Sequence, residues 1–458
     1  MQRQISILID GAQSFNKEGT GIASYTRSLA STLGSLGCKI EVLYGRPMVV
    51  KKNSTALELS SQVFGELPKQ GRVDKLLNAV SLAVHAYAPF RGSVRPIEIS
   101  QAGVDLATRE PPLPKADVIW NASRLYDRAG YFFQIKRRFI EVRLDSPVAL
   151  AHWTGPMAVK AKGCPNVYTL HDLVPLQFPH FVVDRAGRSA LLHAVIAREA
   201  DLVITVSEAS KQAIIELLGL PPERVCVTYQ PTPPLPNVSR EDSARLVQSV
   251  YGVKAGKYAL FLGAVEPKKN LKRLIEAFLL ANPGIPLLIA GPLGWLYTDI
   301  LELMATVERN SEQQDTPVRR LGYLPRRHVT ALLQCARFFA FPSIWEGFGL
   351  PVLEAMQMGV PVLTSNTGSL PEVAGDAAVL VDPLDIEAMS RGIQVLAGDE
   401  DLRRDLIARG YLQAQKFGRD IYIERLREAY ARVGVELPKQ VVCRQDAPRA
   451  QDSLQFPA

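Results

Sequence analysis

Residues 338–359 read FFAFPSIWEGFGLPVLEAMQMG, and this stretch decides the fold. The apolar run at 338–341 is typical of a short strand buried on both faces of a sheet. A loop containing glycines follows, and Pro351 then stands where proline is favoured, at the first position of a helix. Gly359 marks the end of that helix. The pattern predicts a strand, a loop and a helix, which is the repeating unit of a parallel sheet.

The same alternation continues on both sides of this stretch. Apolar runs predict further strands at 258–262, 286–290, 318–321, 360–364 and 378–381. Helical spacing of apolar residues predicts helices at 271–281, 296–308, 327–334, 351–358, 383–397, 401–416 and 419–433. Strands that alternate with helices predict a doubly wound parallel sheet, with ligands bound at the carboxyl ends of its strands. We assign this domain to residues 250–416.

The first part of the chain opens with another such unit. A strand at 5–9 leads through a turn-rich loop to a helix at 22–36, and further strands are predicted at 39–44, 117–120, 148–152, 167–170 and 202–206. Between about 46 and 115 the pattern weakens, apart from one helical stretch at 73–87, and we interpret this segment as an insertion. These residues predict a first α/β domain over 1–236.

Segments at the ends of the two domains also have a distinctive composition. Four prolines at 230–236, followed by polar residues at 237–242, predict an interdomain linker. We expect the amphipathic helix at 419–433 to pack back on the first domain. The tail at 438–458 is polar with mixed charge, which predicts disorder.

Length and composition narrow the functional classes. The 458 residues exceed the ~250–300 over which one hydrophobic core keeps growing, so two domains are expected, with a ligand cleft between them. The net charge of +7 favours anionic partners, but no Lys/Arg run resembles a nucleic-acid arm, and we expect no nucleic-acid partner. Five scattered cysteines (Cys38, Cys164, Cys226, Cys335 and Cys443) argue against disulfides and zinc. With no leader-like start and no apolar run of 18 residues, the sequence predicts a cytoplasmic protein.

Two carboxylates frame the loop quoted first. Glu346 precedes it, Glu354 lies just inside the next helix, and seven residues separate them. A carboxylate at either place can accept hydrogen bonds from sugar or ribose hydroxyls, while Gly347 and Gly349 let the backbone approach a diphosphate near the helix N-terminus. The alternative is that Glu354 only stabilises that N-terminus.

Three other loops carry candidate residues. The sequence GAVEPKKNL at 263–271 places Lys268 or Lys269 after a strand, where a lysine can hold phosphate as a point charge or can simply be solvated. Gly19 and Gly21 occupy the first strand-to-helix turn, but they do not form a G-x-G-x-x-G fingerprint, which disfavours a nicotinamide-dependent oxidoreductase. His171 also follows a strand; its role is either structural or at the ligand.

Taken together, these blocks resemble family 4 of the retaining glycosyltransferases, which have the two-Rossmann-domain architecture called GT-B. The resemblance runs from about residue 5 to 433. It is strongest in FPSIWEGFGLPVLEAM, GVPVLTSN and GSLPEVAGDAA, and it includes GYLP at 322–325, HDLVPLQFP at 171–179 and ADLVITVSEASK at 200–211. The family pattern E-x7-E falls on Glu346 and Glu354.

The resemblance implies specific roles for residues. The catalytic positions would be His171, which lines the reacting sugar, Glu346, which contacts the hydroxyls of that sugar, and Lys269, which binds phosphate. The positions that hold the nucleotide-sugar would be Gly21, Lys268, Lys269, Leu324, Phe348, Gly349, Leu350 and Glu354, with Glu354 on the ribose. The sequence departs from the usual family pattern at three places. Ala264 stands where many members place an arginine on the diphosphate. Ala23-Ser24 replaces Gly-Arg, and Gln230-Pro231 replaces Asn-Gly.

The resemblance also implies a reaction. We expect a retaining hexosyltransferase that needs neither metal nor cofactor and takes a nucleotide-sugar as its donor substrate. The blocks look most like bacterial enzymes that build surface polysaccharide, including lipopolysaccharide, from GDP-mannose or a GDP-deoxyhexose such as rhamnose. The acceptor, held by the first domain, would be a glycan or a lipid-linked glycan. A UDP-sugar donor and an inactive sugar-nucleotide-binding protein remain alternatives.

Residues 131–143 are a candidate for binding to a membrane surface. Between 131 and 143, Phe132, Ile135, Phe139 and Val142 recur at helical spacing, interleaved with Lys136, Arg137, Arg138 and Arg143. Such a helix could lie on the anionic inner face of the plasma membrane and reach a lipid-linked glycan. The alternative is a helix packed on the sheet with a solvated basic face.

Overall fold

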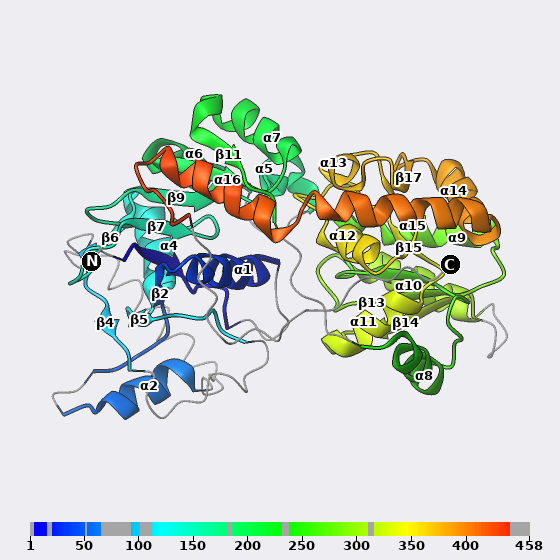
Figure 1. The fold of residues 1–458 in the computed structure, drawn as a ribbon, viewed down its shortest axis with the longest axis horizontal. Helices are drawn as coiled ribbons and strands as arrows, with labels where there is room; N and C mark the ends of the chain where they lie inside the picture. Colours follow the sequence, from blue (N-terminus) through cyan, green and yellow to red (C-terminus); the bar gives the residue numbers. More distant parts are fainter. Residues whose placement is uncertain are drawn as a thin grey trace.

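The computed structural model describes residues 4–15, 21–50, 53–65, 93–100, 112–181, 186–230, 238–309 and 316–439. Two α/β domains lie side by side, each built around its own sheet (Figure 1). The predicted class, two doubly wound Rossmann-like domains, is confirmed. The predicted helical stretch at 73–87, the linker residues 231–236 and the tail from 440 lie outside the described residues.

The first domain contains an eight-stranded sheet in the order β11-β10-β9-β7-β1-β2-β5-β4, parallel except for the last pair. Its strands are β1 Ser6–Asp10, β2 Lys39–Tyr44, β4 Ile97–Glu98, β5 Val118–Asn121, β7 Leu150–Trp153, β9 Asn166–Thr169, β10 Leu202–Thr205 and β11 Val225–Val227. A small sheet joins β3 Ser93–Val94, β6 Ile140–Val142 and β8 Val159–Ala161. The helices are α1 Gly21–Ser35, α2 Ala56–Phe64, α4 Leu125–Lys136, α5 Val174–Gln177, α6 Ala186–Glu199 and α7 Glu208–Leu218.

The second domain is a six-stranded parallel sheet in the order β14-β13-β12-β15-β16-β17. Its strands are β12 Ala259–Leu262, β13 Leu287–Ala290, β14 Val318–Gly322, β15 Phe338–Phe341, β16 Val362–Ser365 and β17 Ala378–Val381. The helices are α8 Arg240–Tyr251, α9 Leu271–Ala281, α10 Thr298–Arg309, α11 Arg326–Cys335, α12 Leu350–Gln357, α13 Leu370–Ala374, α14 Ile386–Gly398 and α15 Glu400–Gln415. All four residues of β15 are fully buried, as an all-apolar strand between two helical layers requires.

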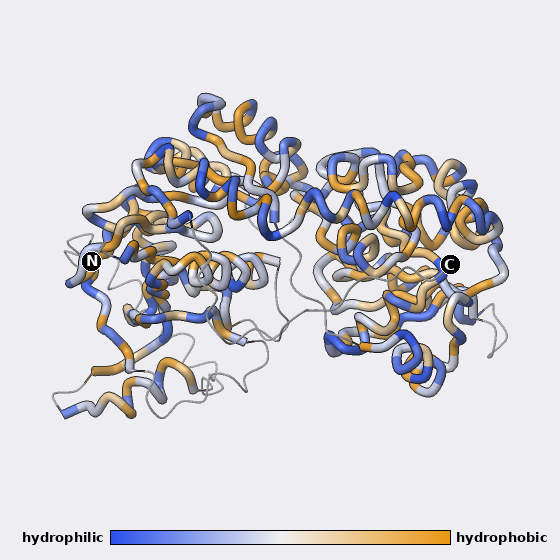
Figure 2. The backbone as a smooth tube through the Cα atoms, viewed as in Figure 1, coloured by the Kyte–Doolittle hydropathy of each residue, from blue (hydrophilic) through white to orange (hydrophobic). Residues whose placement is uncertain are grey.

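Hydropathy follows this layering. In Figure 2 the strands at the centre of each domain are mostly hydrophobic, and the hydrophilic residues gather on the outer helices. Each sheet therefore buries its apolar faces under helices, which leaves the loops at the strand ends free to carry polar chemistry.

The last helix returns to the first domain. After α15, the chain crosses over as α16, Arg419–Ala431, and lies along the first domain (Figure 1). Tyr430 shares a hydrogen bond of 2.6 Å with Nδ1 of His152, and Arg419 donates to Ser35 at 2.7 Å. The guanidinium of Arg425 lies 4.2 Å from the ring centre of Tyr229. Helix α16 thus completes the packing of a domain that begins some 400 residues earlier in the chain.

Two local predictions were wrong. The segment 131–143 is not one helix, because α4 ends at Lys136, Arg137 adopts a left-handed φ of 54° and β6 follows. Ile140 and Val142 alternate inward as strand residues do. Likewise the polar residues around 240 do not continue a linker: they begin helix α8, whose N-cap, Ser239, accepts a hydrogen bond from the backbone of Asp242 at 3.0 Å.

Candidate functional site

Two loops of the second domain meet at the carboxyl ends of neighbouring strands. Because β12 and β15 pair in the sheet, the loops that follow them lie side by side. The first forms a short 3-10 helix, Pro267–Lys269, and the second carries Glu346. Lys269 Nζ donates to Glu346 Oε1 at 2.7 Å, and Lys268 Nζ lies 3.6 Å from the other carboxylate oxygen. The structure thus brings together the predicted phosphate-binding lysines and the predicted sugar-binding carboxylate.

The charges in this cluster are fixed by their neighbours. Burial alone would raise the pKa of Glu346, but the ammonium groups of Lys268 and Lys269 overcome it and lower that pKa to about 2. Burial works against a charged Lys268, yet Glu346 and Asp172 raise the pKa of this amine above its ordinary value. Near neutral pH the cluster therefore holds an ionised carboxylate between two ammonium groups, and that carboxylate is a weak base.

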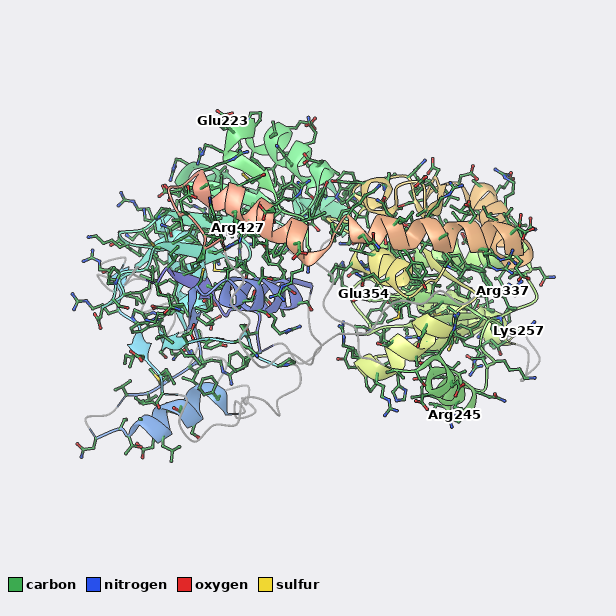
Figure 3. The ribbon with its side chains drawn as sticks, viewed as in Figure 1. Glu223, Arg245, Lys257, Arg337, Glu354 and Arg427 are labelled. Atoms are coloured by element: carbon green, nitrogen blue, oxygen red, sulfur yellow. The ribbon has the colours of Figure 1, made fainter. Side chains whose placement is uncertain are left out.

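Glu354 belongs to a different part of the site. It lies in the first turns of α12, where it is largely buried, and its Oε1 is 3.8 Å from Nη2 of Arg326. Burial raises its pKa, and the guanidinium of Arg326 only partly offsets this. In Figure 3, Glu354 lies on the side of the second domain that faces the first. The two acids of the E-x7-E pattern thus have separate cationic partners.

The glycines between them are explained by close contacts. A Cβ on Gly347 would stand 2.4 Å from the carbonyl oxygen of His171, so any side chain there would force one of the two backbone segments to shift. Gly349 has a φ of 104°, which favours glycine, and a Cβ there would lie 2.7 Å from Leu370. Gly349 is the N-cap of α12, so the helix starts at Leu350, and Pro351 is its second residue rather than the first as predicted.

His171 and Asp172 approach this loop from the first domain. They follow β9, and Nε2 of His171 lies 2.9 Å from the carbonyl oxygen of Thr154, which can only accept. This contact assigns the proton to Nε2, and burial lowers the pKa of the ring, so the imidazole is neutral at pH 7. The ring of Tyr25 meets it edge to face, with centroids 4.9 Å apart. Asp172 lies 4.0 Å from Lys268, which adds a charged contact between the domains.

Sequence reasoning missed the residues that join the loop of His171 to the loop of Gly347. The buried hydroxyl of Ser210 lies 3.1 Å from the carbonyl oxygen of His171 and 3.3 Å from that of Gly347. The carboxylate of Glu372 accepts from the backbone N–H of Glu208 at 3.0 Å. Both contacts lie at the start of α7, within the block ADLVITVSEASK that carries part of the resemblance. The sequence feature that could have pointed to the contact of Ser210 is its position three residues after the N-cap, Ser207.

The remaining predicted donor residues come from both domains. Phe348 packs against Tyr229 of the first domain, with ring centroids 6.2 Å apart. Leu324 follows β14 and is partly buried against the core. Gly21 is the exposed first residue of α1, and residues 16–20 before it, including Gly19, lie outside the described residues. The roles of these residues stay predictions.

A metal centre and a membrane span are two further features that would bear on function. Within the described residues no group of three or more His, Cys, Asp or Glu side chains is arranged to hold a metal ion. None of the helices seen there combines the length and the apolar character needed to cross a membrane.

Comparison with known proteins gives two family matches. Residues 249–413 match the model described as Glycosyl transferases group 1, and residues 75–234 match the model described as Glycosyltransferase Family 4. Each match lies within one domain, and together they leave out only residues 1–74, 235–248 and 414–458.

Curated relatives match over about half of the chain. O-antigen chain mannosyltransferase B of Escherichia coli is 38% identical over 264 residues, which are 55% of this chain and 66% of the relative. Serotype-specific mannosyltransferase WbdA of Escherichia coli is 30% identical over 273 residues, 55% of this chain and 31% of the relative. The match therefore spans just under two thirds of the first relative and less than a third of the second.

Solved structures share the fold over almost the whole chain. The crystal structure of Anabaena HepE in complex with UDP-glucose has a TM-score of 0.58 at 17% identity and covers 93% of this chain and 100% of that one. The glycosyltransferase WaaG, involved in lipopolysaccharide biosynthesis, has a TM-score of 0.55 at 15% identity, covering 94% and 100%. At these identities the likeness concerns the architecture alone.

Proposed function

The chain belongs to glycosyltransferase family 4 and has the GT-B architecture, and on this basis we propose that it transfers a hexosyl residue from a nucleotide-sugar to a growing surface polysaccharide. The proposed sugar is mannose, because the two curated relatives described above are named as mannosyltransferases. The proposed donor is GDP-linked and the proposed acceptor lipid-linked; a deoxyhexose such as rhamnose is the alternative sugar. The observation that carries the proposal is the cluster of Lys268, Lys269 and Glu346, which Asp172, the neighbour of His171, approaches from the first domain.

The proposed mechanism uses the charges of this cluster. As the bond to the leaving diphosphate breaks, negative charge develops on its oxygens, and preorganised cations stabilise it in the transition state. Lys268 and Lys269 supply two such cations, and the N-terminus of α12 supplies a positive dipole end. Glu346 holds both ammonium groups in place before the donor arrives. Its carboxylate oxygens then accept hydrogen bonds from the hydroxyls of the transferred sugar.

Retention of configuration would follow from a front-face displacement. With a pKa of about 2, Glu346 is poorly suited to take a proton from an acceptor hydroxyl at neutral pH. We therefore assign that proton to a phosphate oxygen of the donor, so that the acceptor oxygen enters on the face from which the diphosphate leaves. The neutral imidazole of His171 lines the sugar and orients it.

A panel of nucleotide-sugars tests the function. We expect GDP-mannose to give the largest thermal shift and to be consumed with transfer of mannose, with GDP-rhamnose and UDP-sugars tested in parallel. Since lysines and a helix dipole replace a metal in this proposal, we expect turnover to persist in EDTA. Consumption of a UDP-sugar alone would move the donor to the UDP class. Binding without turnover of any donor would favour the inactive binding protein, and activity that EDTA abolishes and a divalent ion restores would refute metal independence.

The set of residues predicted to contact a membrane has to be revised. Phe132, Phe139 and Val142, which the predicted helix would have presented to lipid, are buried in the first domain. Tyr131 and Ile135 remain 37% and 40% exposed, four residues apart on α4, immediately before three exposed basic residues, Lys136, Arg137 and Arg138. We propose that this smaller patch, residues 131 and 135–138, meets anionic lipid.

Liposome flotation tests the patch. Each basic residue near an anionic surface contributes about 1 kcal/mol, so reversing Lys136, Arg137 and Arg138 to glutamate is expected to lower recovery with phosphatidylserine vesicles by roughly tenfold or more. The matched control reverses Lys254, Lys257 and Lys272, three exposed lysines of the second domain. Equal loss in both triple variants would show a net-charge effect only, and unchanged flotation of the first would remove the patch from the proposal.

A further inference from the structure

Two aromatic side chains from opposite domains meet beside the charged cluster. Phe178 of the first domain and Trp345 of the second have ring centroids 5.6 Å apart, with their planes inclined at 49°. His180 adds an edge-to-face contact to Phe178 at 6.3 Å. Trp345 directly precedes Glu346, and Phe178 lies on the loop that begins with His171. The aromatic pair is thus adjacent in the chain to both halves of the proposed reaction centre.

Local contacts hold both rings in place. Oδ1 of Asp172 accepts from the backbone N–H of Val174 at 3.1 Å, which starts the single turn of α5 that presents Gln177 and Phe178. On the other side, a Cβ added to Gly368, at a φ of 60°, would lie 3.3 Å from the indole ring of Trp345. The absence of a side chain at 368 therefore gives the indole its position.

Two buried polar atoms at this place have no hydrogen-bond partner. Within the part of the chain that the structure describes, Nε1 of Trp345 and Oε1 of Gln177 are both buried and both unpaired. An indole nitrogen can only donate, and an amide oxygen can only accept. A native fold rarely leaves such atoms unmatched unless a ligand or a water completes them. A sugar hydroxyl can accept from the indole N–H, and a sugar hydroxyl can donate to the amide oxygen.

The combination has the chemistry of a sugar site. A pyranose ring presents a face of C–H groups, which packs on aromatic rings, and a rim of hydroxyls, which needs donors and acceptors together. We propose that Gln177, Phe178 and Trp345 form the subsite for the terminal sugar of the acceptor glycan. This inference rests on the proposed function and deepens it: Glu346 contacts the sugar being transferred, and its neighbour Trp345 contacts the sugar that receives it.

The test separates acceptor binding from donor chemistry. Trp345→Phe keeps an aromatic ring and removes the N–H, and Gln177→Met keeps the length and removes the amide oxygen. With octyl α-mannobioside as the acceptor probe, each variant is expected to raise the KM for the acceptor about tenfold, the effect of losing one well-placed hydrogen bond. Donor hydrolysis without acceptor should stay within twofold of wild type. Trp295→Phe, on the loop before α10, is the matched control and should change neither quantity.

Calorimetry provides a readout that needs no turnover. Titration of octyl α-mannobioside into protein saturated with GDP or UDP should show binding to the wild type and about tenfold weaker binding to both variants. An unchanged dissociation constant in both variants would mean that water, not a glycan, forms hydrogen bonds with the indole nitrogen and the amide oxygen. That result would overturn the proposed subsite. An equal loss of donor hydrolysis would show a general structural role and would overturn it as well. If the wild type turns over no nucleotide-sugar but binds the glycan at this subsite, the proposed function fails while the subsite stands.

Discussion

Glu346→Gln is expected to lower kcat by about 10²–10³, the usual effect of removing one preorganised group that acts in the transition state. The variant keeps the shape of the side chain but leaves the ammonium groups of Lys268 and Lys269 without the charge that now aligns them at 3.6 and 2.7 Å. The amide also accepts hydrogen bonds from sugar hydroxyls more weakly than a carboxylate does. Steady-state kinetics with GDP-mannose measure the change in kcat, and calorimetry with GDP measures the change in nucleotide affinity separately.

The other acid of the pattern provides the control. Glu354→Ala is expected to weaken GDP binding about tenfold with a smaller change in kcat, because Glu354 lies with Arg326 and apart from the lysine cluster. The assignment of Glu346 would be wrong if its variant turned over at the wild-type rate. It would also be wrong if both variants lost nucleotide affinity equally and nothing else.

Unfolding at different pH values shows whether Glu346→Gln has removed the charge cluster. The folded-state pKa of about 2 lies below the unfolded value of about 4.3, so ionised Glu346 stabilises the protein above the unfolded pKa. This contribution disappears as the pH falls from about 4 towards 2. The difference in unfolding free energy between wild type and Glu346→Gln should therefore be largest at pH 6–7 and should shrink on acidification.

Lys269→Ala is expected to reduce kcat/KM by about 10³, because it removes a partly buried cation from the proposed place of the leaving diphosphate and leaves Glu346 with only the more distant Lys268. The ammonium of Lys269 lies 5.0 Å from the ring centre of Phe341, which limits its freedom and supports a fixed role. Initial rates at varied donor concentration provide the measurement.

The matched control for this prediction is Lys272→Ala, which removes an exposed lysine three residues further along, on α9. Its kcat/KM should stay within twofold of wild type, which separates the local effect from a change in net charge. Lys269→Arg, which keeps the charge, should recover part of the loss. A Lys269→Ala enzyme that retains kcat/KM within threefold would show that the diphosphate is held elsewhere.

The second domain could be predicted well from its sequence. Strand β15 and helix α9 have the predicted bounds, because short all-apolar runs between turn residues have few alternative structures in a parallel sheet. The meeting of Lys269 with Glu346, 77 residues apart, follows from the rule that loops at the carboxyl ends of neighbouring strands come together.

Other features depended on information that local patterns do not contain. Helical spacing at 132, 135, 139 and 142 suggested one helix, but three of these side chains are buried by a helix end and a separate strand. The contact of Gly347 with His171 and the bridging hydroxyl of Ser210 depend on how the two domains face each other. Periodicity within one element cannot predict such a contact, because it concerns surfaces more than a hundred residues apart.

Helix α16 has a consequence for the order in which the two domains can fold during synthesis. The imidazole of His152 is fully buried between Tyr430 and Thr169, with hydrogen bonds of 2.6 Å to each, and Thr169 in turn pairs with Tyr25 at 3.0 Å. Until Tyr430 has left the ribosome, His152 lacks one of these partners and the first domain lacks part of its packing. The amino-terminal domain, although synthesised first, can complete its core only after the carboxyl-terminal domain has been translated.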